Sequence, residues 1–199
     1  METKKKLFLV DAYALIFRGY YAFIKNPRIN SKGVDTSAIM GFTNSLFDVI
    51  KREKPDYIAV CFDKGGSHER TKIFKEYKAN RDETPEAIKI AVPYIEKILK
   101  SLNIATVVKE GYEADDIIGT IAKKAKQKNL KTYMVTPDKD FAQLVEKDIY
   151  MYRPVFGGGY ETWGIDEVLK KFEINKTSQV IDFLAMKGDS VDNLSLIHI

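Results

Sequence analysis

The chain has 199 residues and a formal net charge of +4, and 45% of its residues are hydrophobic. This length fits one large domain or two small ones, and the hydrophobic fraction excludes a disordered chain. A single cysteine, Cys61, excludes an internal disulfide and favours a reducing compartment. The first apolar run ends at Asp11, too early for a signal peptide or a membrane span, so we expect a cytoplasmic protein.

Short apolar runs alternate with amphipathic segments over most of the chain. The runs are rich in β-branched or aromatic residues and predict buried strands at Leu7–Val10, Tyr57–Phe62, Ala105–Val108 and Thr132–Val135. Capping residues and apolar residues at helical spacing predict helices from Thr36 or Ser37 to about Arg52, from Pro85 to Leu102 and, most clearly, from Glu113 to Lys128. This alternation predicts an α/β fold with a parallel sheet.

The pattern changes after Asp148. Ile149–Val155 and Tyr160–Trp163 flank three consecutive glycines, which predicts a β-hairpin rather than a phosphate-binding loop. Two short helices are expected after the hairpin, near Ile165–Phe172 and Thr177–Met186.

Acidic residues follow the predicted strands and begin the clearest helix. Asp11, Asp63 and Asp138 each come directly after an apolar run, and Asp140 lies two residues further on. Because the carboxyl ends of parallel strands meet at one edge of a sheet, we expect these side chains to lie together. Further candidates are the helix-start residues Glu113, Asp115 and Asp116 and the pair Asp189 and Asp192, which would share a face if their segment were helical.

Nine carboxylates gathered at one edge would repel one another and would favour a bound cation. Oxygen ligands without a cluster of His or Cys favour Mg²⁺ or Mn²⁺ over zinc, and the number of acids suffices for two ions. Taken singly, an Asp after a strand is usually a turn residue, and acids in a first helical turn usually complement the helix dipole. The combination is therefore what predicts a metal site.

A basic and aromatic segment follows Asp63. From Lys64 to Arg81 it contains six basic and two acidic residues. Cations with aromatic residues between them suit a phosphate backbone and unstacked bases, but a solvated helix face with apolar residues packed beneath it explains the pattern equally well. A second basic run, from Lys123 to Lys131, is better explained as the outer face of an amphipathic helix.

Six short motifs occur in a characteristic order: Leu9–Asp11, Val60–Asp63, Tyr77–Arg81, Gly111–Asp116, Thr136–Asp140 and Gly188–Asn193. They resemble the motifs of the 5′-nuclease (flap endonuclease-like) family, in its bacterial DNA polymerase I branch, and the YKxNR and GYEADD patterns are specific in combination. The resemblance runs from Lys6 to Asn193. It implies a PIN-like/5′-nuclease fold, a mainly parallel sheet flanked by helices, with a helical arch at about Lys64–Pro85 that clamps single-stranded DNA.

The same resemblance implies a structure-specific 5′-3′ exonuclease or flap endonuclease of DNA replication and repair that uses two Mg²⁺ ions, for which Mn²⁺ can substitute. One ion would be held by Asp11, Asp63, Glu113, Asp115 and Asp116, and the other by Asp138, Asp140, Asp189 and Asp192. Water activated by the metals would attack the phosphorus in line, with Lys78 and Arg81 offsetting charge in the transition state. Arg18, Arg70 and Tyr77 would contact DNA, Tyr77 as a stacking platform.

Two other classes of function compete with this interpretation. A catalytically silent nucleic-acid-binding module of the same fold would not need the full set of carboxylates. A small-molecule phosphohydrolase on a doubly wound sheet would leave the basic segment unexplained, and the residues after Asp11 lack the second acid of a strand-end DxD motif. The expected partner is therefore DNA with a 5′ flap, a nick or a single-stranded 5′ end, bound by a monomer without membrane attachment.

The resemblance ends at Asn193, where the family continues with a helix–hairpin–helix element that grips duplex DNA. Residues Leu194–Ile199 do not match that element. We therefore expect residues 1–193 to form the catalytic domain, without the duplex-binding element or the polymerase domain of the parent protein, and we expect weak activity or none from this chain.

Overall fold

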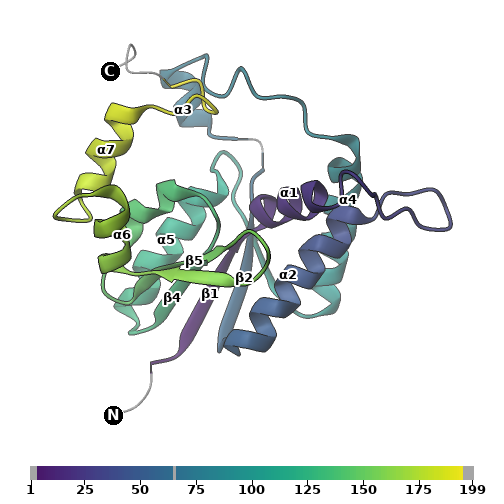
Figure 1. The fold of residues 1–199 in the computed structure, drawn as a ribbon, viewed down its shortest axis with the longest axis horizontal. Coiled ribbons are helices and arrows are strands. Elements are labelled where there is room, and N and C mark those ends of the chain that lie inside the picture. The colour runs from purple at the N-terminus through teal and green to yellow at the C-terminus, as the bar shows by residue number, and fades with distance from the viewer. Residues whose placement is uncertain (1–3, 65, 195–199) are drawn as a thin grey trace.

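The structure, a computed structural model, describes residues 4–64 and 66–194, so the non-matching tail lies, apart from Leu194, outside the described residues. A six-stranded sheet in the order β3-β2-β1-β4-β5-β6 forms its centre (Figure 1). The parallel strands are β1 (Lys6–Asp11), β2 (Tyr57–Phe62), β3 (Ala105–Val108), β4 (Lys131–Val135) and β5 (Ile149–Pro154). β6 (Tyr160–Trp163) runs antiparallel to β5. The predicted α/β fold with a mainly parallel sheet is confirmed.

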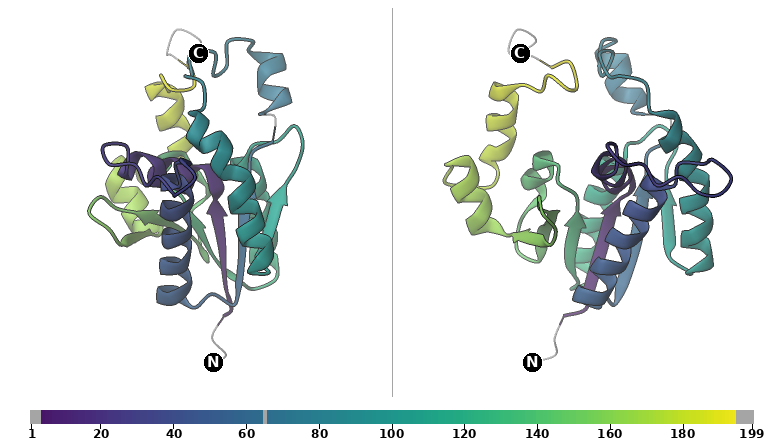
Figure 2. Two further views of the ribbon diagram at one scale, coloured as in Figure 1. Left: turned by 90° about the vertical axis from the view of Figure 1, so that its right-hand side faces the viewer. Right: turned by 45° about the vertical axis from the view of Figure 1, so that its right-hand side comes forward.

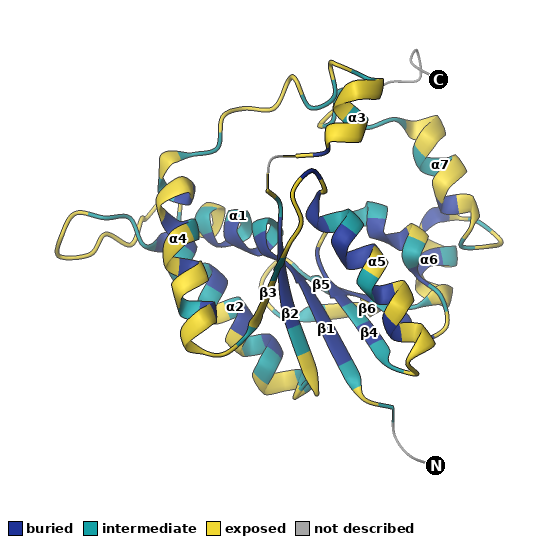
Figure 3. Ribbon diagram, turned by 180° about the vertical axis from the view of Figure 1, so that it is seen from behind, coloured by how far each residue is buried: buried dark blue, intermediate teal, exposed yellow. Residues whose placement is uncertain are grey.

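Helices cover both faces of the sheet, and successive residues of each strand point to opposite faces. Phe8 and Val10 face a core shared with α1 (Ala12–Ala22), α2 (Ser37–Glu53) and α4 (Glu86–Ser101). Leu7 and Leu9 face a second core, formed with α5 (Ala114–Gln127), the 3-10 helix η1 (Lys139–Leu144), α6 (Ile165–Phe172) and α7 (Gln179–Lys187). Figure 3 shows these buried faces along the strands and helices. No helix among the described residues is both long enough and apolar enough to cross a bilayer.

The predicted hairpin is present, whereas one predicted strand differs in its burial. The three glycines from Gly157 to Gly159 all have positive φ, as the tight connection from β5 to β6 requires. β3 was expected to be buried, but its side chains are mostly exposed because it lies at the edge of the sheet, beside β2. Periodicity alone does not distinguish an edge strand from a central one.

The arch predicted at Lys64–Pro85 crosses above the carboxyl edge of the sheet (Figure 2), and hydrogen bonds from Lys78 and Asn80 join it to the turn that follows α7. Its helical part is α3 (His68–Ile73), which is capped by Ser67. From Phe74 onward the arch consists of turns and extended chain, and Lys78 has φ of +59°, which a right-handed helix cannot accommodate. The helix of the arch is therefore confined to the part before Phe74.

Candidate active site

Two of the strand-end acids are tied to the elements that follow or adjoin them. Asp11 caps α1 by accepting from the Ala14 amide (3.1 Å), and its other oxygen accepts from Thr136 Oγ1 (3.1 Å). Burial raises the pKa of Asp11 to about 6, and the nearby charge of Asp63 adds to the effect. Asp63 accepts from the Ala114 amide at 2.5 Å. The end of β2 therefore meets the start of α5, and the end of β1 meets Thr136.

The first turn of α5 places two adjacent acids in opposite environments. Asp116 accepts from the Glu113 amide (3.1 Å) in a capping box, and Arg70 binds both its oxygens at 2.8 and 2.9 Å. The hydrogen bonds from Arg70 hold the pKa of Asp116 below its usual value. Asp115 differs, since burial and then the charges of neighbouring acids, Asp11 first, raise its pKa to about 8. The folded protein therefore disfavours a negative charge on Asp115 and favours one on Asp116.

The loop between β4 and η1 carries Asp138 and Asp140 to the same edge. Asp138 caps η1 by accepting from the Asp140 amide at 2.9 Å. Its own amide donates to Thr136 Oγ1 at 3.2 Å, so the buried Thr136 hydroxyl links Asp11 to this loop. Burial, with the charge of Asp138 second, raises the pKa of Asp140 to about 6. Thr136 was not among the predicted site residues, although it belongs to one of the six motifs.

Asp189 and Asp192 do not share a helical face. Gly188 has φ of +69° and ends α7, and the next residues form a turn closed by hydrogen bonds between Asp189 and Leu194 at 2.7 and 2.8 Å. Asp189 accepts from the Val191 amide within this turn at 2.9 Å. Asp192 instead faces the arch, so the predicted pair is separated by the turn.

The arch places its polar side chains directly on the acids. Lys78 Nζ lies 2.8 Å from Glu113 Oε1 and 3.9 Å from Asp192 Oδ2, and Arg81 forms an ion pair with Asp192. The Tyr77 hydroxyl lies 3.3 Å from Glu113 Oε2 and 3.2 Å from Asp192 Oδ2. The structure therefore brings these three arch residues into contact with two of the predicted acids, Glu113 and Asp192.

Two asparagines that sequence reasoning missed hold the arch to the C-terminal turn. Asn80 Nδ2 donates to the Ser190 carbonyl at 2.7 Å, and Asn193 Nδ2 donates to the Glu76 carbonyl at 3.0 Å. The Lys78 amide also donates to the Asp192 carbonyl at 3.1 Å. Both asparagines occur in the motifs quoted for the resemblance, which was the available signal.

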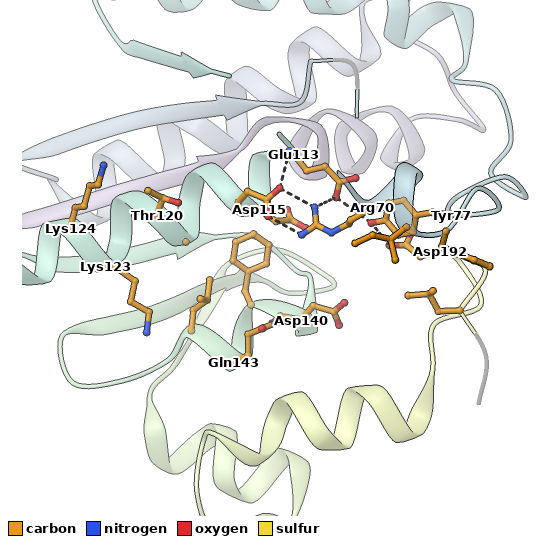
Figure 4. A pocket seen from close by; sticks show the side chains of 17 residues that line it. Arg70, Tyr77, Glu113, Asp115, Thr120, Lys123, Lys124, Asp140, Gln143 and Asp192 are labelled. Carbon is orange, nitrogen blue, oxygen red and sulfur yellow. Dashed lines mark hydrogen bonds and ion pairs between the residues drawn. The ribbon is translucent and has the colours of Figure 1, made fainter. Parts of the chain in front are cut away.

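A cavity of about 790 Å³ opens between α5, η1 and the arch (Figure 4). Among the predicted residues, Glu113, Asp115, Asp116, Asp140, Asp192, Arg70 and Tyr77 line it. Arg18 lies elsewhere: its Nη2 donates to the Val155 carbonyl at 2.7 Å and so holds the tip of the hairpin. Cys61 is fully buried in β2, and burial raises the pKa of its thiol to about 12, as befits a core residue rather than a nucleophile.

Residues 6–173 match a family described as 5′-3′ exonuclease, N-terminal resolvase-like domain. The chain belongs to this family. A 5′-3′ exonuclease of Aquifex aeolicus is 37% identical to it over 190 residues, which cover 96% of this chain and 64% of that protein. DNA polymerase I of Bacillus subtilis is 36% identical over 196 residues, 98% of this chain and 22% of the polymerase. The chain thus spans less than two thirds of the first relative and about a fifth of the second.

The fold of the chain is also similar to that of solved structures. T5 5′-exonuclease with bound zinc ions has a TM-score of 0.73 and 22% identity, with 95% of this chain and 69% of that chain covered. The catalytic core of Rad2, solved in complex with a DNA substrate, has a TM-score of 0.58 and 17% identity, with coverage of 96% and 57%. The PIN-like/5′-nuclease fold is therefore confirmed.

Repulsion links eight of the nine predicted acids in two overlapping electrostatic groups, which share Asp138. The charges of Asp11, Asp63 and Glu113 help to raise the pKa of Asp115. The charges of Asp189 and Asp192 help to raise the pKa of Asp140. Asp138 acts on both groups, through Asp11 and Asp115 in one and Asp140 in the other. Asp116 differs from its neighbour Asp115 because Arg70 neutralises it. Repulsion of this kind is what a bound cation relieves.

The donor set fits divalent cations, although the acids are not already arranged as a cage. Among residues 4–64 and 66–194, no three acids, histidines or cysteines are placed as ready metal ligands. Three of the acids, Glu113, Asp116 and Asp192, have cationic side chains of the arch as their partners. The donor atoms are all oxygens, which suit hard cations such as Mg²⁺. Burial raises the pKa of Asp11 and Asp115, and a bound cation would stabilise their charged forms.

Proposed function

We propose that this chain is a metal-dependent, structure-specific 5′-3′ exonuclease or flap endonuclease that hydrolyses phosphodiester bonds in DNA. The observation that carries the proposal is that cations of the arch contact two acids of separate segments, Glu113 and Asp192. Hydrogen bonds through Thr136 join Asp11 to the loop of Asp138 below them, and Asp63 accepts from the start of α5. A relative named 5′-3′ exonuclease and the T5 D15 flap endonuclease, solved as a complex with DNA and metal ions, support it.

The two electrostatic groups suggest how two cations would be divided. Asp11, Asp63, Glu113 and Asp115 would hold the first cation, and Asp138, Asp140, Asp189 and Asp192 the second. Asp116 would act on the first cation through a water molecule, because Arg70 and the capping box already engage its oxygens. Cations bound there would lower the pKa of the attacking water and neutralise charge on the phosphate.

The arch residues would bind and orient the scissile phosphate. Lys78 and Arg81 contact carboxylate oxygens in the structure, and phosphate oxygens present the same kind of anionic acceptor. Fixed cations stabilise charge that develops in a transition state more than they stabilise the ground state. Tyr77 lines the cavity beside them, where its ring can stack on an unpaired base.

Incubation with a labelled 5′-flap DNA, with Mg²⁺ or with EDTA, tests this function. Cleavage should require Mg²⁺ or Mn²⁺, and Asp115→Asn should abolish it. Asp166→Asn, which changes an exposed acid of α6, is the matched control and should cleave like the unsubstituted chain. Cleavage that persists undiminished in EDTA would contradict the metal mechanism. Tight binding of the flap without cleavage under all metal conditions would instead indicate a silent binding module.

A further inference from the structure

The cavity continues beyond the acids along α5. Glu113 and Asp115 lie on one side, and Thr120, Lys123 and Lys124 lie further along the helix (Figure 4). Gln143 of η1 also lines the cavity. The chemistry of the cavity therefore changes along its length, from carboxylates to side chains that donate hydrogen bonds and carry positive charge.

The α5 residues that line the cavity are regularly spaced in the sequence. Asp116, Thr120, Lys123 and Lys124 follow one another at spacings of four, three and one, which places them on one side of the helix. Lys126 is a contrasting residue of the same basic run. It pairs with Glu146 Oε2 at 2.5 Å and does not line the cavity, whereas Lys123 pairs with Glu146 Oε1 at 3.3 Å and does. The basic run is therefore divided between the cavity and the outer face.

The remaining wall of the cavity is apolar and partly aromatic. It includes Ile73 and Phe74 from the arch and Phe141 and Leu144 from η1. Ile73 is 85% exposed, which is unusual for a large apolar side chain beside a polar site. An apolar wall opposite cations suits unpaired nucleotides, because bases pack on the wall while phosphates meet the cations. Paired bases do not offer their faces in this way.

We propose that this part of the cavity is a subsite for the unpaired 5′ strand of the DNA substrate. The strand runs from the acids along α5, with its phosphates at Lys123 and Lys124 and its bases against the accessible part of the wall, around Ile73, Phe74 and Leu144. The proposal rests on the proposed nuclease function and adds the direction that the flap takes away from the acids.

Binding measurements in EDTA, where no cleavage is expected, test the subsite with two DNAs of the same sequence. One carries a 5′ flap of about ten nucleotides, and the other is a nicked duplex without a flap. The unsubstituted chain should bind the flapped DNA more tightly. The double variant Lys123→Gln/Lys124→Gln should bind it about tenfold more weakly and should lower the slope of log K against log salt by about 1.4, since a single strand contributes about 0.7 per phosphate contact.

The control is Lys126→Gln, which removes one charge from the same helix and from Glu146, the partner that Lys126 shares with Lys123. Lys126→Gln should bind the flapped DNA as tightly as the unsubstituted chain does. The double variant should bind the nicked duplex as tightly as the unsubstituted chain does. Three results would overturn the subsite: no loss of flap affinity in the double variant, an equal loss on the nicked duplex, or an equal loss in Lys126→Gln. Failure of the nuclease function has a different signature, namely no Mg²⁺-dependent cleavage by the unsubstituted chain whatever its pattern of binding.

Discussion

Lys78 Nζ lies 2.8 Å from Glu113 Oε1, and this contact joins the arch to the start of α5. The side chains of Lys78 and Glu113 are only 23% and 6% exposed, so solvent screens the ion pair much less than it screens a surface pair. The backbone of Lys78 is fixed as well, because its amide donates to the Asp192 carbonyl. The lysine is therefore held above the acids rather than free to sample solvent.

Replacing Lys78 should damage catalysis more than DNA binding. Lys78→Met keeps much of the side-chain volume but removes the cation, and we expect the single-turnover cleavage rate to fall about 10²–10³-fold, as for other fixed groups that stabilise transition-state charge. Lys78→Arg should retain part of the rate. Lys75→Met, which alters an exposed lysine of the same arch segment, should cleave normally. Equal rates for Lys75→Met and Lys78→Met would remove Lys78 from the site.

Asp115 should make the metal-free protein less stable as the pH rises. Burial raises its pKa in the folded state to about 8, whereas the value in the unfolded chain is near 3.8. Between these values the folded state binds more protons than the unfolded state, so stability falls as pH increases. Asp115→Asn removes this effect and should raise the free energy of unfolding by about 2–3 kcal/mol at pH 8, after discounting for partial solvation.

Urea unfolding in EDTA at several pH values measures this effect. The advantage of Asp115→Asn over the unsubstituted chain should shrink steadily from pH 8 to pH 5. Asp116→Asn is the instructive comparison, because Arg70 lowers the pKa of Asp116 and the substitution should destabilise the protein at pH 8. An advantage of Asp115→Asn that does not depend on pH would show that the charge of Asp115 is not the cause.

The positions of the strand-end acids could be predicted because they depend on local sequence and one topological rule. Asp11 and Asp63 follow apolar runs, and parallel strands bring their ends to one edge. The nature of each acid's partner could not be predicted in this way. Arg70 reaches Asp116 across 46 residues of chain, and no periodicity in the sequence links the two. The separate environments of Asp115 and Asp116 follow from that contact.

Local sequence patterns also could not predict the edge position of β3 or the turn at the end of the described chain. Whether Ala105–Val108 is central or at the edge depends on how the other strands are ordered. The turn that contains Asp189 and Asp192 depends on the positive φ of Gly188, and on the asparagine contacts that hold the turn to the arch. Both are set by tertiary contacts, which a helical or strand periodicity does not encode.

The buried hydroxyl of Thr136 should control how well the acids bind metal. It donates to Asp11 and accepts from the amide of Asp138, so it couples the two electrostatic groups. Thr136→Val keeps the shape but removes both hydrogen bonds, and we expect about a tenfold higher Mg²⁺ concentration at half-maximal cleavage. Thr136→Ser retains the hydroxyl and should stay within about threefold of the unsubstituted chain. Titration calorimetry with Mn²⁺ provides a reading that is independent of cleavage, and equal affinities for both variants would contradict the coupling.

Arg153 should act on the second group of acids from outside the cavity. Its Nη2 donates to the Pro137 carbonyl at 2.9 Å, directly before Asp138, while Nη1 binds Glu161 at 2.8 Å and the guanidinium lies 3.9 Å from the centre of the Trp163 ring.

Arg153→Met removes the brace on the loop of Asp138 but leaves an apolar side chain on Trp163. We expect about a tenfold rise in the Mg²⁺ concentration at half-maximal cleavage, with a nearly normal rate at saturating Mg²⁺, because loss of a group that orients metal ligands typically costs that much affinity. Glu161→Gln is the matched control: it weakens the ion pair but leaves the Pro137 contact, so its Mg²⁺ requirement should be unchanged. A shift of the same size in Glu161→Gln would assign the effect to the hairpin as a whole, and a lower rate of Arg153→Met at saturating Mg²⁺ with no change in Mg²⁺ requirement would refute positioning through Pro137.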